Sequence, residues 1–270
     1  GSEMCIRDRF AVIDDFLVFK FWAGEQLAYM MPIGNGDLKA VLRKLIEDAD
    51  KEKHNFCMLG VCSNMRADLE AILPERFIFT EDRAYADYIY LRSDLATLKG
   101  KKFQAKRNHI NRFRNTYPDY EYTPITPDRI QECLDLEAEW CKVNNCDQQE
   151  GTGNERRALI YALHNFEALG LTGGILHVNG KIVAFTFGMP INHETFGVHV
   201  EKADTSIDGA YAMINYEFAN RIPEQYIYIN REEDLGIEGL RKAKLSYQPV
   251  TILEKYMACL KDHPMDMVRW

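Results

Sequence analysis

The hydrophobic and polar positions along the chain alternate with two different periods, and the changes between them divide the sequence into strands and helices. The first clear signal is a pair of apolar runs, 11–13 and 16–19, separated by Asp14 and Asp15, which predicts a β-hairpin. The chain then alternates as far as residue 92. The expected elements are a helix at 38–51 with Asp37 as its N-cap, a strand at 56–61, a short helix that ends at Pro74, and strands at 77–79 and 85–91.

After residue 119 the alternation starts again and is more complete. Its sharpest signal is Asn179-Gly180 between two apolar runs, which is typical of a two-residue type I′ hairpin turn. The expected elements are strands at 120–125, 173–178, 181–189, 195–200, 226–229 and 252–260, and helices at 128–143, 156–169, 210–221 and 240–247. The resulting order, β-α-α-β-β-β-α-β-α-β, predicts an α+β fold built on a mixed sheet.

The first half shows a less complete version of the same order of strands and helices, so we expect two similar domains joined in tandem. A length of 270 residues allows one large domain or two smaller ones. We expect residues 1–9 to be a leader or cloning remnant outside the fold and 10–92 to form an N-terminal domain. A basic helical connector at 93–118 and a C-terminal domain at 119–270 would complete the chain.

Composition excludes several classes of protein. With 46% hydrophobic and 27% charged residues, the chain is neither disordered nor collagen-like. No apolar run approaches the ~20 residues of a membrane span, since the run 16–23 is short and contains Lys20. The seven cysteines are odd in number and include no C-x-x-C pair, which argues against a disulfide framework or a zinc ribbon. We therefore expect idle thiols, including those at the x4 spacings Cys57/Cys62 and Cys141/Cys146, no metal site, and a reducing cytoplasm.

Charge is distributed unevenly along the chain. The formal net charge of −8 argues against a protein coated in nucleic acid. However, residues 99–114 hold seven of the 33 basic residues and no acidic residue, which leaves 26 basic and 41 acidic residues elsewhere. On a helix this stretch would present a positive ridge that attracts phosphates, although a solvated basic face is the common alternative. The ridge residues that we assign to a phosphate-bearing donor are Lys99, Lys102, Lys106 and Arg107.

A run of acidic residues follows the strand expected at 226–229. Glu232, Glu233 and Asp234 stand there, just before Gly236. Loops beyond the carboxyl ends of strands are favoured ligand sites in α/β sheets. A carboxylate at this place is suited to act as a general base or to hold an ammonium group of the acceptor, while a plain polar loop is the alternative. We assign Glu232 and Glu233 to catalysis, and Asn230 and Asp234 to the acceptor.

The next helix carries a second set of candidates. Arg241 and Lys244 are three positions apart, so both could contact one anion of the donor. Tyr247 ends this helix just before Pro249 and could give a proton to a leaving group, although a partly buried aromatic residue is the commoner role.

Three weaker signals stand elsewhere. Gly209 precedes a helix whose N-terminus could receive a donor phosphate, although Asp208 beside it would repel one. Glu137 lies among apolar neighbours on its helix and is a second acceptor candidate, or a residue at the edge of that face. His199, within a strand, is expected to be a structural histidine. The sequence contains no G-x-S-x-G, P-loop, Rossmann or H-E-x-x-H motif.

Two of these stretches also carry a resemblance. Residues 100–113 and 230–249, together with Glu254-Lys255-Tyr256, resemble bacterial proteins related to the C-terminal domain of phosphatidylglycerol lysyltransferase. The resemblance extends over nearly the whole chain from about residue 10. It implies two tandem GNAT-like acyltransferase domains, akin to the FemABX aminoacyltransferases, and an N-terminal domain that is shorter than usual.

This resemblance implies transfer of an acyl or aminoacyl group to an amine or hydroxyl acceptor. The co-substrate would be acyl-CoA or aminoacyl-tRNA, with no covalently bound cofactor and no metal, and the acceptor a small molecule, peptide or lipid. Residues 205–210 stand where GNAT enzymes hold CoA, and they keep Gly209 and Ala210 but lack the usual Gln or Arg. The alternative hypothesis is a non-catalytic module that binds tRNA or anionic lipid with a degenerate transferase site.

Overall fold

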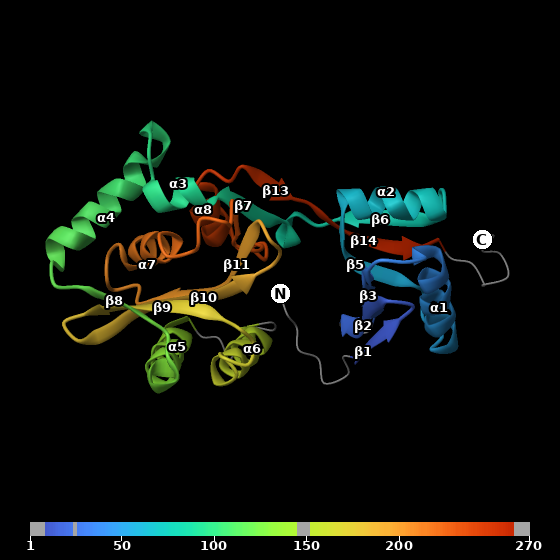
Figure 1. The fold of residues 1–270 in the computed structure, drawn as a ribbon, viewed down its shortest axis with the longest axis horizontal. Helices are drawn as coiled ribbons and strands as arrows, with labels where there is room; N and C mark the ends of the chain where they lie inside the picture. The colour runs from blue at the N-terminus through green and yellow to red at the C-terminus, as the bar shows by residue number, and fades with distance from the viewer. Residues whose placement is uncertain (1–8, 24–25, 145–151, 262–270) are drawn as a thin grey trace. The chain divides into compact units, whose positions relative to one another are not determined.

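The computed structural model describes residues 9–23, 26–144 and 152–261, which fall into two compact units (Figure 1). The first unit contains residues 9–86 together with 253–261, and the second contains residues 87–252. The expected division is therefore wrong at two places. The basic stretch is an integral part of the second unit rather than a connector, and the last strand belongs to the first unit.

The first unit is a seven-stranded sheet with two helices. Its strand order is β1-β2-β3-β5-β14-β6, and β4 pairs with β2. The strands are β1 (Arg9–Ile13), β2 (Phe16–Ala23), β3 (Gln26–Met30), β4 (Ile33–Gly34), β5 (Cys57–Cys62), β6 (Phe77–Glu81) and β14 (Lys255–Leu260), and the helices are α1 (Leu38–Lys51), α2 (Ser63–Ile72) and a 3₁₀ turn at Arg83–Tyr85. Apolar side chains of the sheet and of both helices form one core.

Local signals account for the start of this unit. The β1–β2 hairpin is confirmed, and both of its turn residues, Asp14 and Asp15, have positive φ angles of 49° and 64°. Such angles suit the type I′ turns that match the twist of two paired strands. Helix α1 is also confirmed, with Asp37 as a true N-cap whose carboxylate accepts a hydrogen bond from Ala40 N at 3.1 Å.

The second unit is also a seven-stranded mixed sheet, with the order β13-β7-β12-β11-β10-β9-β8. Strand β12 runs parallel to β11 and antiparallel to β7. The strands are β7 (Asp87–Leu91), β8 (Glu121–Pro124), β9 (Thr172–Val178), β10 (Lys181–Pro190), β11 (Thr195–Ala203), β12 (Tyr228–Asn230) and β13 (Thr251–Leu253). The helices are α3 (Arg92–Thr97), α4 (Gln104–Thr116), α5 (Ile130–Asn144), α6 (Thr152–His164), α7 (Ala210–Ala219) and α8 (Glu238–Leu245), with 3₁₀ turns at Lys101–Phe103 and Pro127–Arg129.

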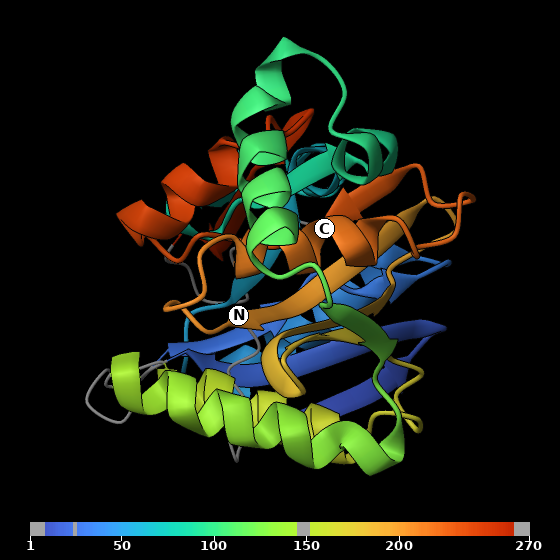
Figure 2. The same cartoon turned by 90° about the vertical axis from the view of Figure 1, so that its left-hand side faces the viewer.

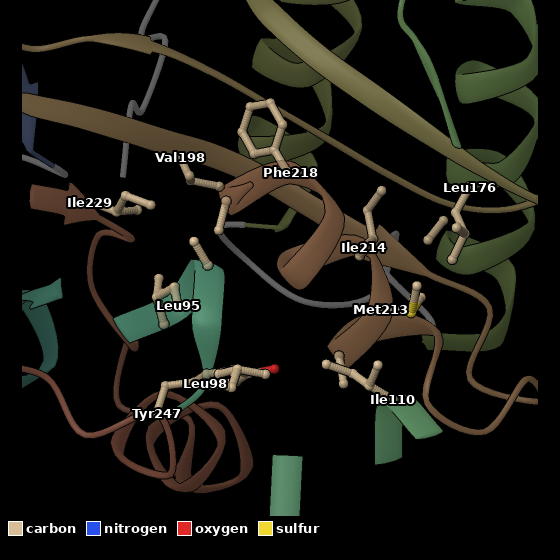
Figure 3. Packing of buried hydrophobic residues seen from close by; sticks show 14 of the residues in the cluster. Leu95, Leu98, Ile110, Leu176, Val198, Met213, Ile214, Phe218, Ile229 and Tyr247 are labelled. Atoms are coloured by element: carbon tan, nitrogen blue, oxygen red, sulfur yellow. The ribbon is translucent and has the colours of Figure 1, made fainter. Parts of the chain in front are cut away.

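Helices cover both faces of this sheet. Helices α5 and α6 lie on one face, and α7 with α4 above it lies on the other (Figures 1 and 2). Each face has its own apolar core. The larger core joins Leu98, just before the basic stretch, and Ile110, within it, to α7 residues such as Met213 and Phe218 (Figure 3). The basic stretch is therefore held to the sheet by its apolar positions. Among the described residues, no helix is long and apolar enough to cross a membrane.

The final strand expected at 252–260 is in fact two strands in two sheets. Strand β13 lies at the edge of the second sheet beside β7, and β14 lies between β5 and β6 of the first. Strand β7 directly follows β6 of the first sheet in the chain, yet it pairs with β12 in the second sheet. Alternation of apolar residues predicts a strand but not its partner, so the sequence pattern could not place these strands.

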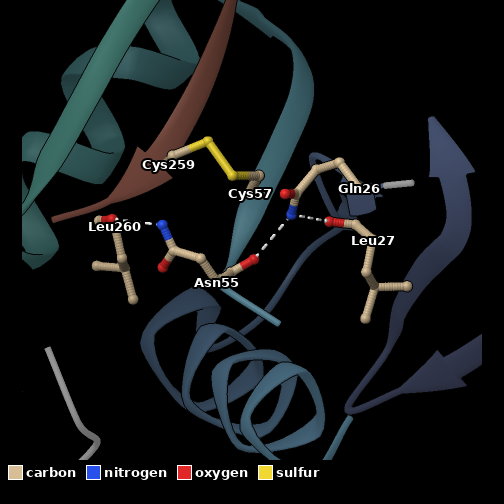
Figure 4. The surroundings of a disulfide bond; sticks show 6 residues. All are labelled: Gln26, Leu27, Asn55, Cys57, Cys259 and Leu260. Carbon is tan, nitrogen blue, oxygen red and sulfur yellow. Dashed lines mark hydrogen bonds between the residues drawn. A yellow bond between two sulfur atoms is a disulfide. The ribbon is translucent and has the colours of Figure 1, made fainter. Parts of the chain in front are cut away.

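One disulfide corrects the expectation of idle thiols. Cys57 on β5 and Cys259 on β14 are opposite each other on neighbouring strands and form a disulfide bond, with a Cα–Cα distance of 4.1 Å (Figure 4). Beside it, Asn55 Nδ2 donates to Leu260 O at 3.0 Å, and Gln26 Nε2 donates to Asn55 O at 3.1 Å. The pair is 202 residues apart in sequence, which is why spacing gave no hint of it. Cys5 and Cys146 lie outside the described residues.

Candidate functional site

The candidate site lies where two parallel strands of the second unit separate. Strand β12 pairs with β11 only from Tyr228 to Asn230, whereas β11 continues to Ala203 beside β10. Beyond Asn230 the chain stays with β7, because Arg231 N donates to Tyr88 O at 3.0 Å. The separation therefore opens at the carboxyl end of β12, the kind of place where α/β sheets bind ligands.

Two side-chain contacts, one of them an ion pair, join the separated strands. His199 Nδ1 lies 2.6 Å from Glu232 Oε1, and Arg231 Nη2 lies 2.9 Å from Glu201 Oε1. His199 is the extra residue of a β-bulge, because the adjacent β10 residues pair with its two neighbours on β11. Glu232 has a positive φ of 56°. The bulge and the left-handed residue turn these two side chains toward each other.

Asn230 fixes the end of β12. Its Nδ2 donates to Asp87 Oδ2 at 3.0 Å, and its Oδ1 accepts from Glu232 N at 2.7 Å. Both groups of the amide are thus used inside the protein. Asn230 orients the backbone on which Glu232 stands, which differs from the acceptor contact that the sequence suggested.

Arg231 and Lys106 approach one aromatic ring. The Lys106 ammonium lies 3.8 Å from the Tyr247 ring centroid, and the Arg231 guanidinium carbon lies 4.9 Å from it. Burial, together with the nearby Arg231 charge, lowers the pKa of Lys106 to about 8. Burial also opposes the charge on Arg231, but the attraction of Glu201 outweighs it and raises the pKa of Arg231. Lys106 thus points inward and does not belong to an outer ridge.

Tyr247 is buried, and burial raises the pKa of its hydroxyl. The phenol therefore stays protonated at neutral pH and keeps a proton to donate. It lies in the larger core close to Leu98 (Figure 3).

Other acidic and basic candidates form the scaffold of this loop. Asp234 is fully buried, accepts two hydrogen bonds from Arg241 at 2.8 and 2.9 Å, and accepts another from Tyr88 Oη at 2.6 Å. Burial alone would raise the pKa of Asp234, but Arg241 and Tyr88 hold it well below its usual range. In this structure Arg241 and Asp234 thus hold each other rather than a donor phosphate and an acceptor.

Lys244 has a similar structural role. It is buried, and its ammonium donates to the backbone carbonyls of Arg231, Glu232 and Glu233. Burial lowers its pKa to about 8. Because three carbonyls surround its charge, Lys244 fixes the loop that carries Glu232. Glu233 is itself buried, whereas the Glu232 side chain keeps 36% of its exposure and is the more accessible of the two carboxylates.

The basic stretch keeps few free charges. Lys102 donates to Asp94 at 2.8 Å, and Arg107 closes the turn before α4 by donating to the carbonyls of Leu98 and Gly100. Lys99 is exposed. The ridge expected from the sequence is thus largely paired internally, and Lys106 is the one donor candidate in it that reaches the separated strands.

Two candidates lie away from this site. Gly209 begins α7 with a φ of +85°, and an added Cβ would come within 3.0 Å of His109 O on α4. This glycine therefore permits close packing of two helices. Glu137 on α5 is buried and pairs with Arg156 on α6 at 3.1 Å. Both helices lie on the face of the sheet opposite α7 (Figure 1).

Sequence reasoning missed part of the site. Arg231 lies inside the acidic run but was passed over, and Glu201 was not considered. His199 was expected to be structural, yet it contacts the best carboxylate candidate. The available signal is the spacing of His199 and Glu201, two ionisable residues that lie two positions apart on one strand.

Comparison with known proteins agrees with this architecture. The model of the family described as "Phosphatidylglycerol lysyltransferase, C-terminal" matches residues 7–259. A crystal structure of a conserved protein from Bacteroides thetaiotaomicron is 99% identical, with a TM-score of 0.91 over 94% of this chain and 86% of that one. The C-terminal domain of a putative lysylphosphatidylglycerol synthetase from Agrobacterium fabrum is 12% identical, with a TM-score of 0.72 over 94% and 84% of the two chains.

The tandem arrangement also has a structural counterpart. A tandem GNAT protein of the clavulanic acid biosynthesis pathway is 10% identical, with a TM-score of 0.51 over 92% of this chain and 80% of that one. The expected α+β fold with tandem GNAT-like domains is confirmed. Among curated proteins, one from Mycoplasmoides gallisepticum is 25% identical over 177 residues, which cover 63% of this chain and 55% of the relative. The matching part thus spans about half the length of that relative.

Proposed function

Because the chain belongs to the family of phosphatidylglycerol lysyltransferase C-terminal domains, we propose that it transfers an acyl or aminoacyl group from an activated donor to an amine or hydroxyl acceptor. The activated donor is an acyl-CoA or an aminoacyl-tRNA. The observation that carries the proposal is the separation of β11 from β12, where His199 contacts Glu232 and where Arg231 also contacts the Tyr247 ring beside Lys106.

The chemistry needs two substrates held together and two proton transfers. The acceptor N or O attacks the carbonyl carbon of the ester or thioester, and the bond from that carbon to the leaving O or S breaks. Glu232 takes the proton that the acceptor loses, with His199 holding its carboxylate in place. Tyr247 gives a proton to the leaving group, and the Arg231 charge beside its ring favours the phenolate that this leaves.

The scaffold residues support this arrangement indirectly. Lys244 and Asn230 fix the backbone of Glu232, and the Asp234–Arg241 pair anchors the following turn. A loop with these internal bonds presents Glu232 in one orientation, which favours catalysis by positioning.

The compartment follows from the donors and remains a prediction. Acyl-CoA and aminoacyl-tRNA are cytoplasmic molecules, so we expect the reaction in the cytoplasm. Disulfides are uncommon there, so the Cys57–Cys259 bond would have to persist through its position between two paired strands, where Cys57 is buried and Cys259 is half-buried.

The decisive experiment offers both kinds of donor in parallel. Purified protein is incubated with labelled acyl-CoAs or labelled aminoacyl-tRNAs and a mixture of amine and hydroxyl acceptors, and donor consumption is followed. Consumption of one donor class identifies it and supports the proposal. If neither class is consumed while the protein still binds RNA or anionic vesicles, the non-catalytic binding module becomes the better description.

A further inference from the structure

The surroundings of Tyr247 hold more positive charge than negative charge. Lys106 and Arg231 both contact this ring, and Glu201 is the carboxylate paired with Arg231. No carboxylate of the described residues lies within ion-pair distance of the Lys106 ammonium. The Glu201 carboxylate is also shared, because its other oxygen accepts from Asn215 Nδ2 at 3.1 Å.

Arg231 also has an unused donor. Its Nη2 is bonded to Glu201, whereas its Nη1 is buried and has no hydrogen-bond partner within the described part of the chain. Buried donors are nearly always paired, so an unpaired guanidinium nitrogen points to a missing acceptor. The side chain keeps only 11% of its exposure, so bulk solvent does not readily supply that acceptor.

These two features call for the same ligand. One additional negative charge would balance Lys106, Arg231 and Glu201, and one oxygen acceptor would satisfy Arg231 Nη1. A phosphodiester offers both, because it carries a single charge and two free oxygens. Arginine and lysine are also the side chains that most often bind phosphate.

We propose that Lys106 and Arg231 form a binding site for one phosphodiester group of a substrate, next to the Tyr247 ring. The proposal rests on the transferase function above and deepens it, since both donor classes carry groups of this kind. RNA contains phosphodiesters, and coenzyme A contains a diphosphate whose two esterified phosphoryl groups each bear one negative charge. It assigns phosphate recognition to these two inward cations instead of the exposed ridge. Lys102 and Arg107 are already engaged with Asp94 and with the turn before α4, which leaves them poorly suited to this task.

The same stretch supplies a matched control. Lys106→Gln removes a charge from the inward face, and Lys99→Gln removes an equal charge from an exposed position of the same basic stretch. Arg231→Lys keeps a charge beside Glu201 but removes the Nη1 donor. Circular dichroism and the thermal unfolding midpoint confirm that each variant is folded before it is used.

Binding is measured by calorimetric titration with dimethyl phosphate as the isolated diester and with acetate as a carboxylate of equal charge. We expect dimethyl phosphate to bind, Lys106→Gln and Arg231→Lys to weaken it about tenfold, and Lys99→Gln to change it less than twofold. Equal effects of Lys106→Gln and Lys99→Gln, no binding of dimethyl phosphate, or acetate binding as tight as that of the diester would each overturn the proposal.

Two further titrations identify the source of the diester. Coenzyme A represents one donor class, and an RNA acceptor-stem minihelix ending in CCA represents the other. The donor whose affinity falls in Lys106→Gln but not in Lys99→Gln is the one whose phosphate occupies the site. If the transfer assay is negative while this discrimination holds, the binding site stands and the proposed catalysis fails. If transfer occurs but both variants bind the donors normally, the site fails and the proposed catalysis stands.

Discussion

The two units share one strand order but differ in what lies at their pair of parallel strands. The path β1-β2-β3-β5-β14-β6 of the first unit corresponds to β9-β10-β11-β12-β7-β13 of the second, where β8 adds one more strand outside β9. In both, a helix connects the parallel pair, β3–α1–β5 and β11–α7–β12. The strand beside the parallel pair has a different origin in each unit: β14 comes from the far end of the chain, whereas β7 is the first strand of the second unit.

The difference is chemical. In the first unit, Met30 on β3 and Gly60 on β5 stand beside the parallel pair, and the Cys57–Cys259 disulfide closes the next pair of strands. In the second unit, the side-chain contacts His199–Glu232 and Arg231–Glu201 occupy the corresponding region. One copy of the architecture is apolar and cross-linked, and the other gathers ionisable groups.

Two lysines show what this contrast means for charge. Lys20 of the first unit donates to both Asp48 and Glu52, at 2.7 and 3.0 Å, and despite burial these carboxylates raise its pKa. Lys106 of the second unit has Arg231 nearby, and its pKa is lowered. A partly buried lysine paired with carboxylates supports the fold, whereas one placed beside another cation is suited to bind an anion. Function therefore follows from local charge pairing on a shared scaffold.

The largest expected effect comes from breaking the charge balance of the second unit. Glu201→Leu leaves Arg231 buried without its carboxylate, and we expect it to lower the free energy of unfolding by about 3–5 kcal/mol. Urea denaturation measures the change. The double variant Glu201→Leu/Arg231→Met should recover much of the loss, because an apolar pair needs no charge compensation. A double variant as unstable as the single one would show that the charge is not the cause.

The corresponding change in the first unit is removal of its cross-link. Cys259→Ser opens a covalent loop that spans 202 residues of sequence separation, and we expect a loss of about 2–4 kcal/mol in the free energy of unfolding. Thermal unfolding with and without dithiothreitol provides the measurement. The wild-type midpoint should fall on reduction to that of the variant. An unchanged midpoint on reduction would mean that the disulfide does not contribute to stability.

Catalysis should depend on one carboxylate of the second unit. Glu232→Gln keeps the size of the side chain but removes the base, and we expect transfer to slow by about a hundredfold, which corresponds to about 2.7 kcal/mol in activation free energy. Glu238→Gln, an exposed change at the start of α8, is the matched control and should retain near wild-type rates. Equal rates in both variants would remove Glu232 from the mechanism.

A smaller effect concerns pH. Because the pKa of Lys106 is lowered to about 8, its ammonium is charged below that pH and loses its proton above it. Arg231 stays charged and Tyr247 stays protonated across this range. Binding of dimethyl phosphate should therefore be constant below about pH 8 and weaken above it. Lys106→Gln should abolish this step. A step that persists in the variant would point to Lys244, whose pKa is also about 8.

The smallest effect is expected on the exposed side of the basic stretch. The Lys102–Asp94 pair is partly exposed, so Lys102→Gln should change the free energy of unfolding by less than about 1 kcal/mol. Transfer rates should stay near those of the wild type. A tenfold loss of donor binding in this variant would return the phosphate site to the outer face of the stretch.

Sequence reasoning succeeded where the information is local. The Asp14-Asp15 and Asn179-Gly180 turns are confirmed because each needs positive φ angles that these residues adopt at low cost. Helix α1 is confirmed for a similar reason, since its cap and its apolar face lie within fourteen consecutive residues.

It failed where partners are distant in the chain. Nothing near β14 or Cys259 specifies a neighbour some two hundred residues earlier. The site shows the same limit. Glu232 and Tyr247 were proposed from their own surroundings, but the direction of Lys106 depends on how α4 packs, and the contact between His199 and Glu232 depends on a bulge.

Because β14 belongs to the first unit but is synthesised after the whole second unit, the two units can complete their sheets only in a fixed order. The unit that starts first in the chain cannot close its sheet until β14 leaves the ribosome, because β5 and β6 both pair with this late strand. Residues 87–252, which start later, have all of their own strands sooner. Until β14 is synthesised, the edges of β5 and β6 that it will cover are unpaired, and they are exposed to wrong pairing while the second unit is being completed. The Cys57–Cys259 bond can form only after β14 has been synthesised, and it then fixes β14 beside β5.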